Sequence, residues 1–358
     1  MVAFMATGMN RVRWGIIGCG SVTEIKSGPG FQLAAGSELV AVMRRQGHLA
    51  EDYARRHGVP KWYADAGQLI NDPDVDAVYV ATPVGYHHDY ALMVSQAGKP
   101  CYVEKPMARN TAECNAMIEA FEKKGMPLFV AYYRRGLDRF LKTREMVLSG
   151  LLGDSLSIKY RFSSVPNLQL SQVALPWRFD PALSGGGLFL DLGSHTLDIL
   201  DFIFGPLRFV KGNATRRRNE YDVEDGVALE FSANNGSVTG LACWDFCGSE
   251  RADLIEISGE RGTLSLSTFG DEPLRYQPLS GDIREISLPN PRHIQQPLIQ
   301  GIVNQLRGDG TSPSTGVSAA RTSKLMDQAL DSYYGGRDDA FWLRPETWRH
   351  TKQVPFLA

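Results

Sequence analysis

The sequence predicts an α/β fold in which a parallel sheet comes first and a mostly antiparallel sheet follows. Strand-like and helix-like segments alternate through the first third of the chain, and hairpin-like pairs of strands dominate the remainder. The length of 358 residues suggests two domains. We therefore expect a short mobile lead-in at residues 1–10, one domain at 11–133 and a second domain at 134–358.

The first domain is predicted from apolar strand patterns that each end at a turn. The expected strands cover residues 11–18, 38–43, 76–82, 100–106 and 127–133, and the expected helices cover 48–58, 87–99 and 111–125. Such alternation with short connections is typical of a parallel sheet that has helices on both faces. Ligands bind to these sheets at the carboxyl ends of the strands, so we expect functional residues directly after each strand.

The second domain is predicted from a change of pattern near residue 135. A helix at 137–149 leads into a strand at 155–162, and a long loop and a glycine run then precede another helix. Asn235-Gly236 separates two alternating runs, which is a strong hairpin signal. A second hairpin is expected around Gly262, and a last helix at 319–332. These patterns predict an antiparallel sheet with helices on one face.

The composition excludes several classes of function. The net charge is −2, so no basic field favours nucleic acid, and no apolar run is long enough to span a bilayer. The five cysteines include no CxxC pair, and we see no ligand set for a metal. We expect reduced thiols and a cytoplasmic protein.

A possible nucleotide-binding turn follows the first strand, at Gly18-Cys19-Gly20. In a dinucleotide fold these glycines let the backbone approach a pyrophosphate, which binds the N–H groups of Ser21 and Val22 at the start of the next helix. The third glycine of the usual fingerprint is replaced by Thr23, and a Ser-Gly-Pro-Gly stretch at 27–30 interrupts the helix. The alternative is a tight turn with a purely structural role.

The end of the second strand carries Arg44 and Arg45, where an acidic residue would favour NAD. Arginine suits a 2′-phosphate, because its guanidinium forms bidentate charge-assisted hydrogen bonds. The pair therefore favours NADP over NAD. Alternatively, both arginines are solvated loop charges.

Two further stretches carry groups able to move protons. Lys105 ends a strand beside Glu104, which places an acid or base near the glycine turn. Asp191 and His195 are four residues apart after a glycine run at 185–187, so on a helix they share one face. A carboxylate so placed orients an imidazole that passes a proton. The alternatives are a surface lysine and a structural histidine.

Together these stretches resemble the Gfo/Idh/MocA oxidoreductases over nearly the whole chain. The resemblance is carried by "GIIGCGSV", "AVYVATPVGYHHDYA", "GKPCYVEKPM", "AYYRR" and "GGGLFLDLGSHTLD". It implies a Rossmann domain followed by an α/β domain with an open, mostly antiparallel sheet that often makes oligomer contacts. The first helix is usually uninterrupted in this family, so the Ser-Gly-Pro-Gly stretch is a departure. Members use either NAD or NADP.

The resemblance also implies roles for individual residues. The lysine of the EKP motif is catalytic or holds the substrate hydroxyl, which points to Lys105, and the family's aspartate and histidine correspond to Asp191 and His195. The resemblance further implies Ala81, Thr82 and Pro83 for the cofactor and Tyr133, Trp177 and Arg178 for the substrate. From their positions beside these stretches we also expect His87 and Glu104 at the cofactor, and Glu104 is placed to hold the lysine ammonium. His87 is equally compatible with capping its helix. Aromatic residues such as Tyr133 and Trp177 are equally common in protein cores.

The function that these expectations describe is hydride transfer between a nicotinamide and a sugar, cyclitol or related polyol or diol. We expect a homo-oligomer, either a dimer or a tetramer. One alternative is a glycosidase that retains NAD, since the family includes such hydrolases. The other alternative is a regulator that senses the cofactor, although relatives of that kind tend to lose the lysine or histidine, and Lys105 and His195 are both present.

Overall fold

The computed structural model describes residues 10–166 and 176–348. The expected mobile lead-in at 1–10 therefore lies outside the described residues, apart from residue 10. The chain divides into two compact units, each built from several segments of the chain. The first unit comprises Met1–Ala108, Glu113–Leu137 and Pro291–Ala320, and the second comprises Arg109–Ala112, Asp138–Asn290 and Arg321–Ala358.

The first unit contains a parallel sheet of six strands in the order β3-β2-β1-β4-β5-β6. The strands are β1 (Val12–Ile17), β2 (Ser37–Met43), β3 (Lys61–Tyr63), β4 (Ala77–Val80), β5 (Cys101–Val103) and β6 (Leu128–Val130). This is the order of a doubly wound dinucleotide-binding sheet, in which the direction of winding reverses between β1 and β4. The predicted Rossmann architecture is confirmed.

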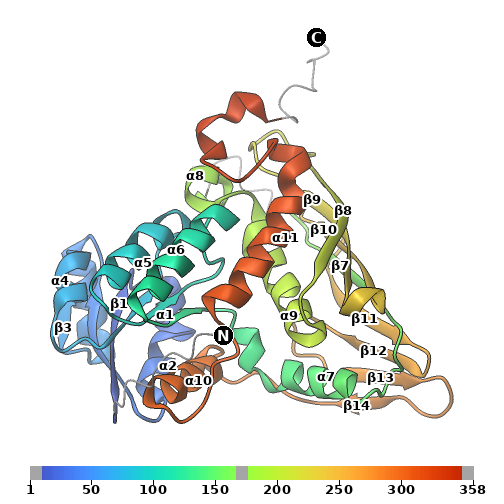
Figure 1. The fold of residues 1–358 in the computed structure, drawn as a ribbon, viewed down its shortest axis with the longest axis horizontal. Coiled ribbons are helices and arrows are strands. Elements are labelled where there is room, and N and C mark those ends of the chain that lie inside the picture. Colours follow the sequence, from blue (N-terminus) through green and yellow to red (C-terminus); the bar gives the residue numbers. More distant parts are fainter. Residues whose placement is uncertain (1–9, 167–175, 349–358) are drawn as a thin grey trace. The chain divides into compact units, whose positions relative to one another are not determined.

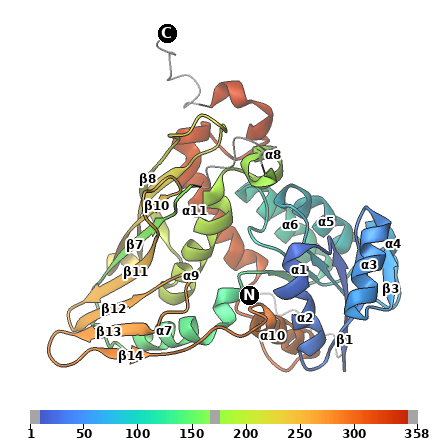
Figure 2. The same cartoon turned by 180° about the vertical axis from the view of Figure 1, so that it is seen from behind.

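Helices cover both faces of this sheet. The helices are α1 (Ser21–Ile25), α2 (Gly28–Leu33), α3 (Gly47–His57), α4 (Ala66–Asn71), α5 (His87–Gln96), α6 (Thr111–Lys124) and α10 (Gln296–Arg307). In Figure 1, α5 and α6 lie in front of the sheet, and in the opposite view of Figure 2, α1 and α2 come to the front. The sheet is therefore buried on both sides, as its continuous apolar strands require.

The two faces of the sheet are packed differently. On one face, aliphatic strand residues such as Val80 and Val103 pack with Ala91 of α5 and Phe121 of α6. On the other face an aromatic cluster forms. It links Trp14 and Phe31 (ring centroids 4.8 Å apart), Phe31 and Tyr79 (5.2 Å), and Tyr79 and Tyr102 (4.8 Å). The side chains of Tyr79 and Tyr102 carry hydroxyl groups, so this second face also holds polar atoms that need partners.

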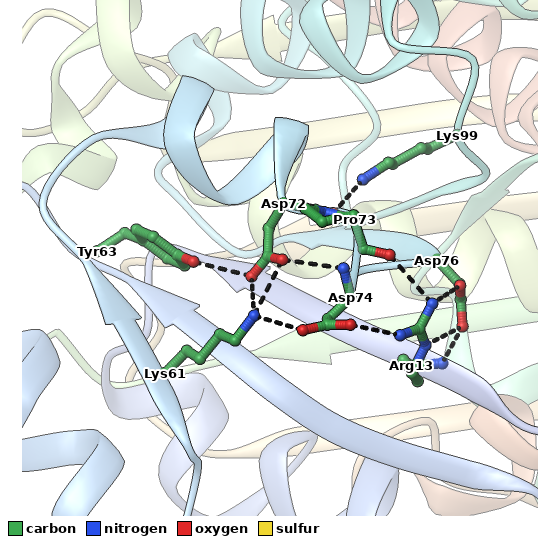
Figure 3. A network of polar contacts seen from close by, with 8 residues as sticks. All are labelled: Arg13, Lys61, Tyr63, Asp72, Pro73, Asp74, Asp76 and Lys99. Carbon is green, nitrogen blue, oxygen red and sulfur yellow. Dashed lines mark hydrogen bonds and ion pairs between the residues drawn. The ribbon is translucent and has the colours of Figure 1, made fainter.

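A network of ion pairs lies around the loop that joins α4 to β4 (Figure 3). The buried carboxylate of Asp72 accepts hydrogen bonds from the Lys61 ammonium (2.9 Å) and the Tyr63 hydroxyl (2.8 Å). Arg13, near the start of β1, forms hydrogen bonds with both oxygens of Asp76, which precedes β4. The amino-terminal edge of the sheet is therefore closed by charges that neutralise one another.

The second unit contains a sheet of eight strands in the order β14-β13-β12-β11-β7-β10-β9-β8. The strands are β7 (Leu156–Ser163), β8 (Arg208–Thr215), β9 (Gly226–Ala233), β10 (Val238–Asp245), β11 (Ala252–Gly259), β12 (Gly262–Leu266), β13 (Leu274–Pro278) and β14 (Arg284–Ile286). Every neighbouring pair is antiparallel except β7 and β10, which are parallel. The predicted mostly antiparallel sheet is confirmed.

The helices of the second unit are α7 (Asp138–Leu148), α8 (Pro181–Ser184), α9 (Ser194–Phe204) and α11 (Gly316–Tyr334), of which α11 begins in the first unit. Figure 1 shows α7, α9 and α11 along one side of the sheet. Burial alternates along β7 and β10, as expected when helices cover only one face. Among the described residues, no helix combines the length and the hydropathy needed to cross a membrane.

The turn residues in the sequence correctly predicted two β-hairpins of the second unit. Asn234, Asn235 and Gly236 all have positive φ (47°, 55° and 95°) in the turn between β9 and β10. Gly262 opens β12 opposite Gly259, which forms the second expected hairpin. The sequence patterns did not identify α2, β3, α4, α8, β13, β14 or α10, and α8 lies where a long loop was expected. Of these, β3 and β14 have only three residues each, and a strand so short shows too little periodicity to stand out.

Candidate active site

The first glycine of the turn after β1 has a conformation and a close contact that other residues would strain. Gly18 has a φ of 90°, and a Cβ at this position would lie 2.8 Å from Thr82 Cγ2 and 3.0 Å from the Thr82 nitrogen. The N–H groups of Gly18 and Cys19 donate to the Met43 carbonyl at the end of β2. Gly18 therefore joins the carboxyl ends of β1, β2 and β4 in one tight contact.

The second glycine borders open space. A Cβ at Gly20 would have only the Gly18 oxygen within 4 Å among the described atoms, at 3.8 Å. The buried Thr23 hydroxyl accepts from the Gly20 N–H (3.0 Å) and donates to the Gly20 carbonyl (2.9 Å), so it closes the start of α1. Among the described residues, the N–H groups of Ser21 and Val22 have no main-chain acceptor. These first-turn N–H groups are the donors that a phosphate uses.

The interruption of the first helix makes room for other parts of the same unit. A Cβ at Gly28 would lie 2.2 Å from the Thr23 oxygen and 2.4 Å from the Tyr53 hydroxyl, which donates to that oxygen. A Cβ at Gly30 would lie 2.9 Å from Ile299 Cδ1 in α10. The Ser-Gly-Pro-Gly stretch thus leaves the glycine turn intact and lets Tyr53 and α10 pack against the broken helix.

The two arginines after β2 have no carboxylate partner among the described residues. Arg44 and Arg45 are both exposed, and the main-chain N–H of Arg44 donates to the Tyr63 carbonyl. The Arg45 guanidinium lies 5.2 Å from the centroid of the Tyr86 ring, which is a cation–π contact. Both cations are available for an anionic ligand.

The segment after β4 presents an unsatisfied polar atom. Thr82 Oγ1 is buried and has no hydrogen-bond partner among the described residues. Such an atom is costly unless a ligand or water supplies the partner. Ala81 donates its N–H to the Ile17 carbonyl, and Pro83 precedes a short 3₁₀ turn, Val84–Tyr86. A dinucleotide with several phosphate groups fits these features together: the open space at Gly20, the N–H groups at the start of α1, the Thr82 hydroxyl and the two arginines.

His87 connects this segment to the loop after β5. Its Nε2 lies 2.8 Å from the Thr82 carbonyl oxygen and its Nδ1 lies 3.0 Å from the Pro106 carbonyl oxygen. Burial lowers the pKa of the imidazole despite these two oxygens. His87 therefore holds the carboxyl ends of two neighbouring strands together.

The proposed catalytic lysine follows β5. Lys105 is half-buried, and its main-chain N–H donates to the carboxylate of Glu104 (3.0 Å). The same carboxylate, only 8% exposed, accepts from the Tyr79 hydroxyl and the Gln295 amide. Tyr133 lies after β6 in a 3₁₀ turn, where its ring is buried below the Arg134 guanidinium.

The other expected site residues belong to the second unit. Asp191 lies in a short π-helix, Phe189–Gly193, and His195 lies in the first turn of α9. The Asp191 carboxylate accepts from Arg178 Nε at 2.8 Å, and the Arg178 guanidinium lies 4.7 Å from the centroid of the Trp177 ring. His195 is 5% exposed, and its ring meets the Phe269 ring edge to face at 5.8 Å.

The glycine run before Asp191 is surrounded by protein atoms. A Cβ at Gly185 would lie 2.7 Å from the Arg109 oxygen, and one at Gly187 would lie 2.3 Å from the Glu224 oxygen. The buried carboxylate of Glu224 accepts the Gly187 N–H (2.9 Å), and Arg337 donates to the Gly185 carbonyl (2.7 Å). These contacts with protein atoms account for the glycines at positions 185 and 187.

Several residues around the site gave no signal in the sequence. Gln295 reaches Glu104 from a segment far along the chain, and Phe269 meets His195 from the loop that follows β12. Neither belongs to a recognisable motif, and both are brought into place by long-range packing. Within the described residues, no group of three or more His, Cys, Asp and Glu side chains is placed to hold a metal ion.

Both halves of the chain match family models. Residues 12–132 match an oxidoreductase family with an NAD-binding Rossmann fold, and residues 140–265 match the GFO/IDH/MocA C-terminal domain. Among individual proteins, Oxidoreductase P35 of Formosa agariphila is 36% identical over 319 residues, which cover 89% of this chain and 98% of that protein. Trans-1,2-dihydrobenzene-1,2-diol dehydrogenase of Bos taurus is 29% identical over 78% of this chain and 80% of its own length.

The fold is also similar to that of solved structures. One is an oxidoreductase from Agrobacterium radiobacter in complex with NAD⁺, L-tartaric acid and magnesium, with a TM-score of 0.78 and 23% identity. The match covers 90% of this chain and 96% of the other. Family models match both halves of the chain, and a relative named as an oxidoreductase matches it over nearly the whole length of both proteins. The chain therefore belongs to the GFO/IDH/MocA family of NAD(P)-binding oxidoreductases.

Proposed function

We propose that this protein is a dehydrogenase or reductase that prefers NADP(H) and acts on a carbinol carbon of a sugar, cyclitol or cyclic diol. The observation that carries the proposal is the carboxyl edge of the first sheet. There an open glycine turn follows β1, two cations without carboxylate partners in the described part of the chain follow β2, and the EKP lysine follows β5 of the same sheet. The cofactor, when bound, supplies or accepts hydride at the C4 position of its nicotinamide.

The chain holds the cofactor through groups that the rest of the described chain leaves unsatisfied. The N–H groups of Ser21 and Val22 bind the pyrophosphate across Gly18 and Gly20, and Thr82 offers its buried hydroxyl. Ala81 and Pro83 line the same edge, and Glu104 and His87 fix the chain beside it. Arg44 and Arg45 bind the 2′-phosphate, which is the basis for the preference for NADP.

Lys105 and His195 are the candidates for the proton that accompanies hydride transfer. In oxidation one of them removes the hydroxyl proton as hydride leaves the carbinol carbon, and in reduction the same group returns it. Lys105 also polarises the carbonyl oxygen that forms. Asp191, held by Arg178, orients the substrate or the histidine, and Arg178 presents its cation to substrate oxygens.

The proposed substrate class is supported by an aromatic cluster in the second unit and by the name of one relative. His195 is bordered by Phe269, which meets Phe162, and Phe162 in turn packs against Phe246. Phe162 and Phe269 are half-buried, and such a wall packs against the apolar face of a ring. A cyclic compound with vicinal hydroxyls fits this wall and agrees with the dihydrodiol substrate in the name of the bovine relative. Tyr133 and Trp177 are proposed to contribute further contacts.

The test is absorbance of the reduced nicotinamide with NADP and NAD against cyclic diols, inositols and sugars. Lys105→Met should lower turnover about 10²-fold or more, since it removes a positioned acid or base. Lys99→Met is the matched control, because Lys99 precedes the same strand at its other end and donates to the Asp72 carbonyl. Near-normal turnover in Lys105→Met would refute the catalytic role of Lys105. Release of the aglycone from a synthetic glycoside, without net change in the cofactor, would identify an NAD-retaining glycosidase.

A further inference from the structure

A buried hydrogen-bond network surrounds the carboxylate that precedes Lys105. Oε1 of Glu104 accepts from the Tyr79 hydroxyl at 2.5 Å and from Gln295 Nε2 at 2.6 Å. Its Oε2 accepts from the main-chain N–H of Lys105 at 3.0 Å. Three donors thus converge on one carboxylate with little access to water, where such charge-assisted bonds are strong.

Gln295 is the member of this network that comes from a distant part of the sequence. It lies immediately before α10, is 1% exposed, and its Oε1 accepts from the Tyr102 hydroxyl at 3.1 Å. Its main-chain N–H lies 3.3 Å from the Lys26 carbonyl oxygen at the end of α1, and His293 Nδ1 lies 2.7 Å from the Ile25 oxygen. The segment 293–295 therefore contacts both the end of α1 and Glu104.

The amide of Gln295 matches both of its neighbours at once. It donates to a carboxylate through nitrogen and accepts from a tyrosine through oxygen, which a carboxylate or an apolar side chain in its place could not do. Burial and the nearby Glu104 charge raise the pKa of Tyr79 and Tyr102 well above 10, so both remain protonated donors. The arrangement therefore has a fixed direction of hydrogen bonding.

We infer that Gln295 is a positioning residue for Lys105 and links the helix after the glycine turn to the EKP loop. The inference rests on the role of Lys105 proposed above. Because Glu104 holds the main-chain N–H of Lys105, the donors that fix this carboxylate also fix the path of the chain at the lysine. Gln295 connects that carboxylate to the end of α1, whose first turn is proposed to bind the pyrophosphate.

The experiment compares Gln295→Met with Gln300→Met in the full-length protein. Both residues lie in the same α-helical region, but Gln300 forms hydrogen bonds with Ala35 at the end of α2 and not with Glu104. The first readout needs no activity: trace acylation of Lys105 across pH, quantified by mass spectrometry against the exposed Lys123 in the same molecule. The second readout is kcat and KM for the best substrate, together with the NADPH dissociation constant.

Gln295→Met should change the relative acylation rate of Lys105 by at least about threefold, because a displaced EKP loop changes the exposure and the neighbours of the amine. It should lower kcat about 10-fold to 100-fold, the usual cost of a misplaced catalytic group, with NADPH affinity within about twofold. Gln300→Met should leave all three quantities within about twofold of the wild type. Should Gln295→Met fail to fold, Tyr102→Phe removes the donor that orients the amide and should act in the same direction.

Unchanged Lys105 acylation and unchanged kcat in a folded Gln295→Met protein would overturn the inference. The failure of the proposed function gives a different pattern. If Lys105→Met retains full turnover while Gln295→Met still alters acylation of Lys105, then Gln295 positions the lysine but the lysine is not the catalytic group. A kcat loss with unaltered acylation would show that Gln295 acts elsewhere, and would also count against the inference.

Discussion

The two edges of the first sheet are built in opposite ways. At the amino-terminal edge, Arg13, Lys61 and the carboxylates of Asp72, Asp74 and Asp76 satisfy one another. At the carboxyl-terminal edge, Arg44 and Arg45 have no carboxylate partner among the described residues, and the Thr82 hydroxyl has no hydrogen-bond partner there. One edge uses its charges to stabilise the fold, and the other leaves donors for a ligand.

This contrast separates stability from binding within one sheet. Both edges are made by the same strands, so hydrophobic burial does not distinguish them. What differs is whether the charged groups are paired within the described part of the chain, and unpaired groups at the carboxyl ends of parallel strands commonly mark binding sites. Substitutions at the amino-terminal edge should therefore change stability alone, and those at the carboxyl-terminal edge should change binding.

The largest effect is expected for Gly18→Ala, which breaks the carboxyl-terminal edge. A Cβ there is disfavoured by the φ of 90° and by contact with Thr82 at 2.8 Å. We expect NADPH affinity to fall at least about 100-fold, because the shifted turn misplaces the phosphate donors, together with a stability loss of about 1–3 kcal/mol. Fluorescence titration with NADPH and thermal unfolding measure the two effects.

Gly58→Ala is the matched control for that substitution. Gly58 also has a positive φ, 65°, but it ends α3, and a Cβ at this position would meet no described atom within 4 Å. It should lose about 1 kcal/mol of stability and keep its NADPH affinity. Equal binding losses in the two variants would show that affinity follows stability rather than the glycine turn.

A smaller effect is expected for the double substitution of Arg44 and Arg45 by alanine. Loss of charge-assisted bonds to a 2′-phosphate should weaken NADPH binding about 10-fold to 100-fold and leave NADH binding within about threefold. Arg55→Ala is a suitable control, since Arg55 is exposed on α3 and pairs with Asp52. Parallel losses for NADPH and NADH would instead indicate a general electrostatic effect on the nucleotide.

The smallest effect is expected at the amino-terminal edge, for Asp72→Asn. It should cost about 1–2 kcal/mol of stability at neutral pH and leave NADPH affinity unchanged, since the hydrogen bonds it weakens lie at the opposite edge. Guanidinium unfolding curves and NADPH titration measure the two quantities. A binding loss comparable to that of Gly18→Ala would contradict the division between the edges.

The same variant has a predicted pH dependence. Burial would raise the pKa of Asp72, but the Asp74 N–H, the Lys61 ammonium and the Tyr63 hydroxyl outweigh it, and the pKa lies below its ordinary value of 3.8. A carboxylate whose pKa is lower in the folded state than in the unfolded state stabilises the protein at pH values above the unfolded-state pKa. This stabilisation is lost as the pH falls through the folded-state pKa. The stability difference between wild type and Asp72→Asn should be constant above about pH 5 and shrink below about pH 4.

Local patterns in the sequence predicted most of the architecture. The alternation of apolar strands and amphipathic helices predicted the parallel sheet, and Asn235-Gly236 marked a hairpin that the structure contains. The motif glycine at Gly18 was correctly placed at a turn after β1. These features depend on residues close in sequence, which is why they were predictable.

Features that depend on distant contacts were not predictable. Nothing near Gln295 indicates that it meets Glu104, because residues 291–320 return to the first unit through contacts with residues far away in the sequence. Likewise, the glycine at Gly187 reflects the proximity of Glu224, which a single sequence does not reveal. The roles of individual side chains at the site remain predictions, since they depend on a bound cofactor and substrate.

The most direct test of the account is the ratio of dissociation constants for NADPH and NADH with the wild-type protein, measured by nicotinamide fluorescence at one ionic strength. Arg44 and Arg45 have no carboxylate partner among the described residues. We therefore expect NADPH to bind at least about 10-fold more tightly than NADH, which is the contribution of one charge-assisted contact or more. Tighter binding of NADH would contradict the role of the arginines. Binding of neither nucleotide would contradict the assignment of this edge as the cofactor site.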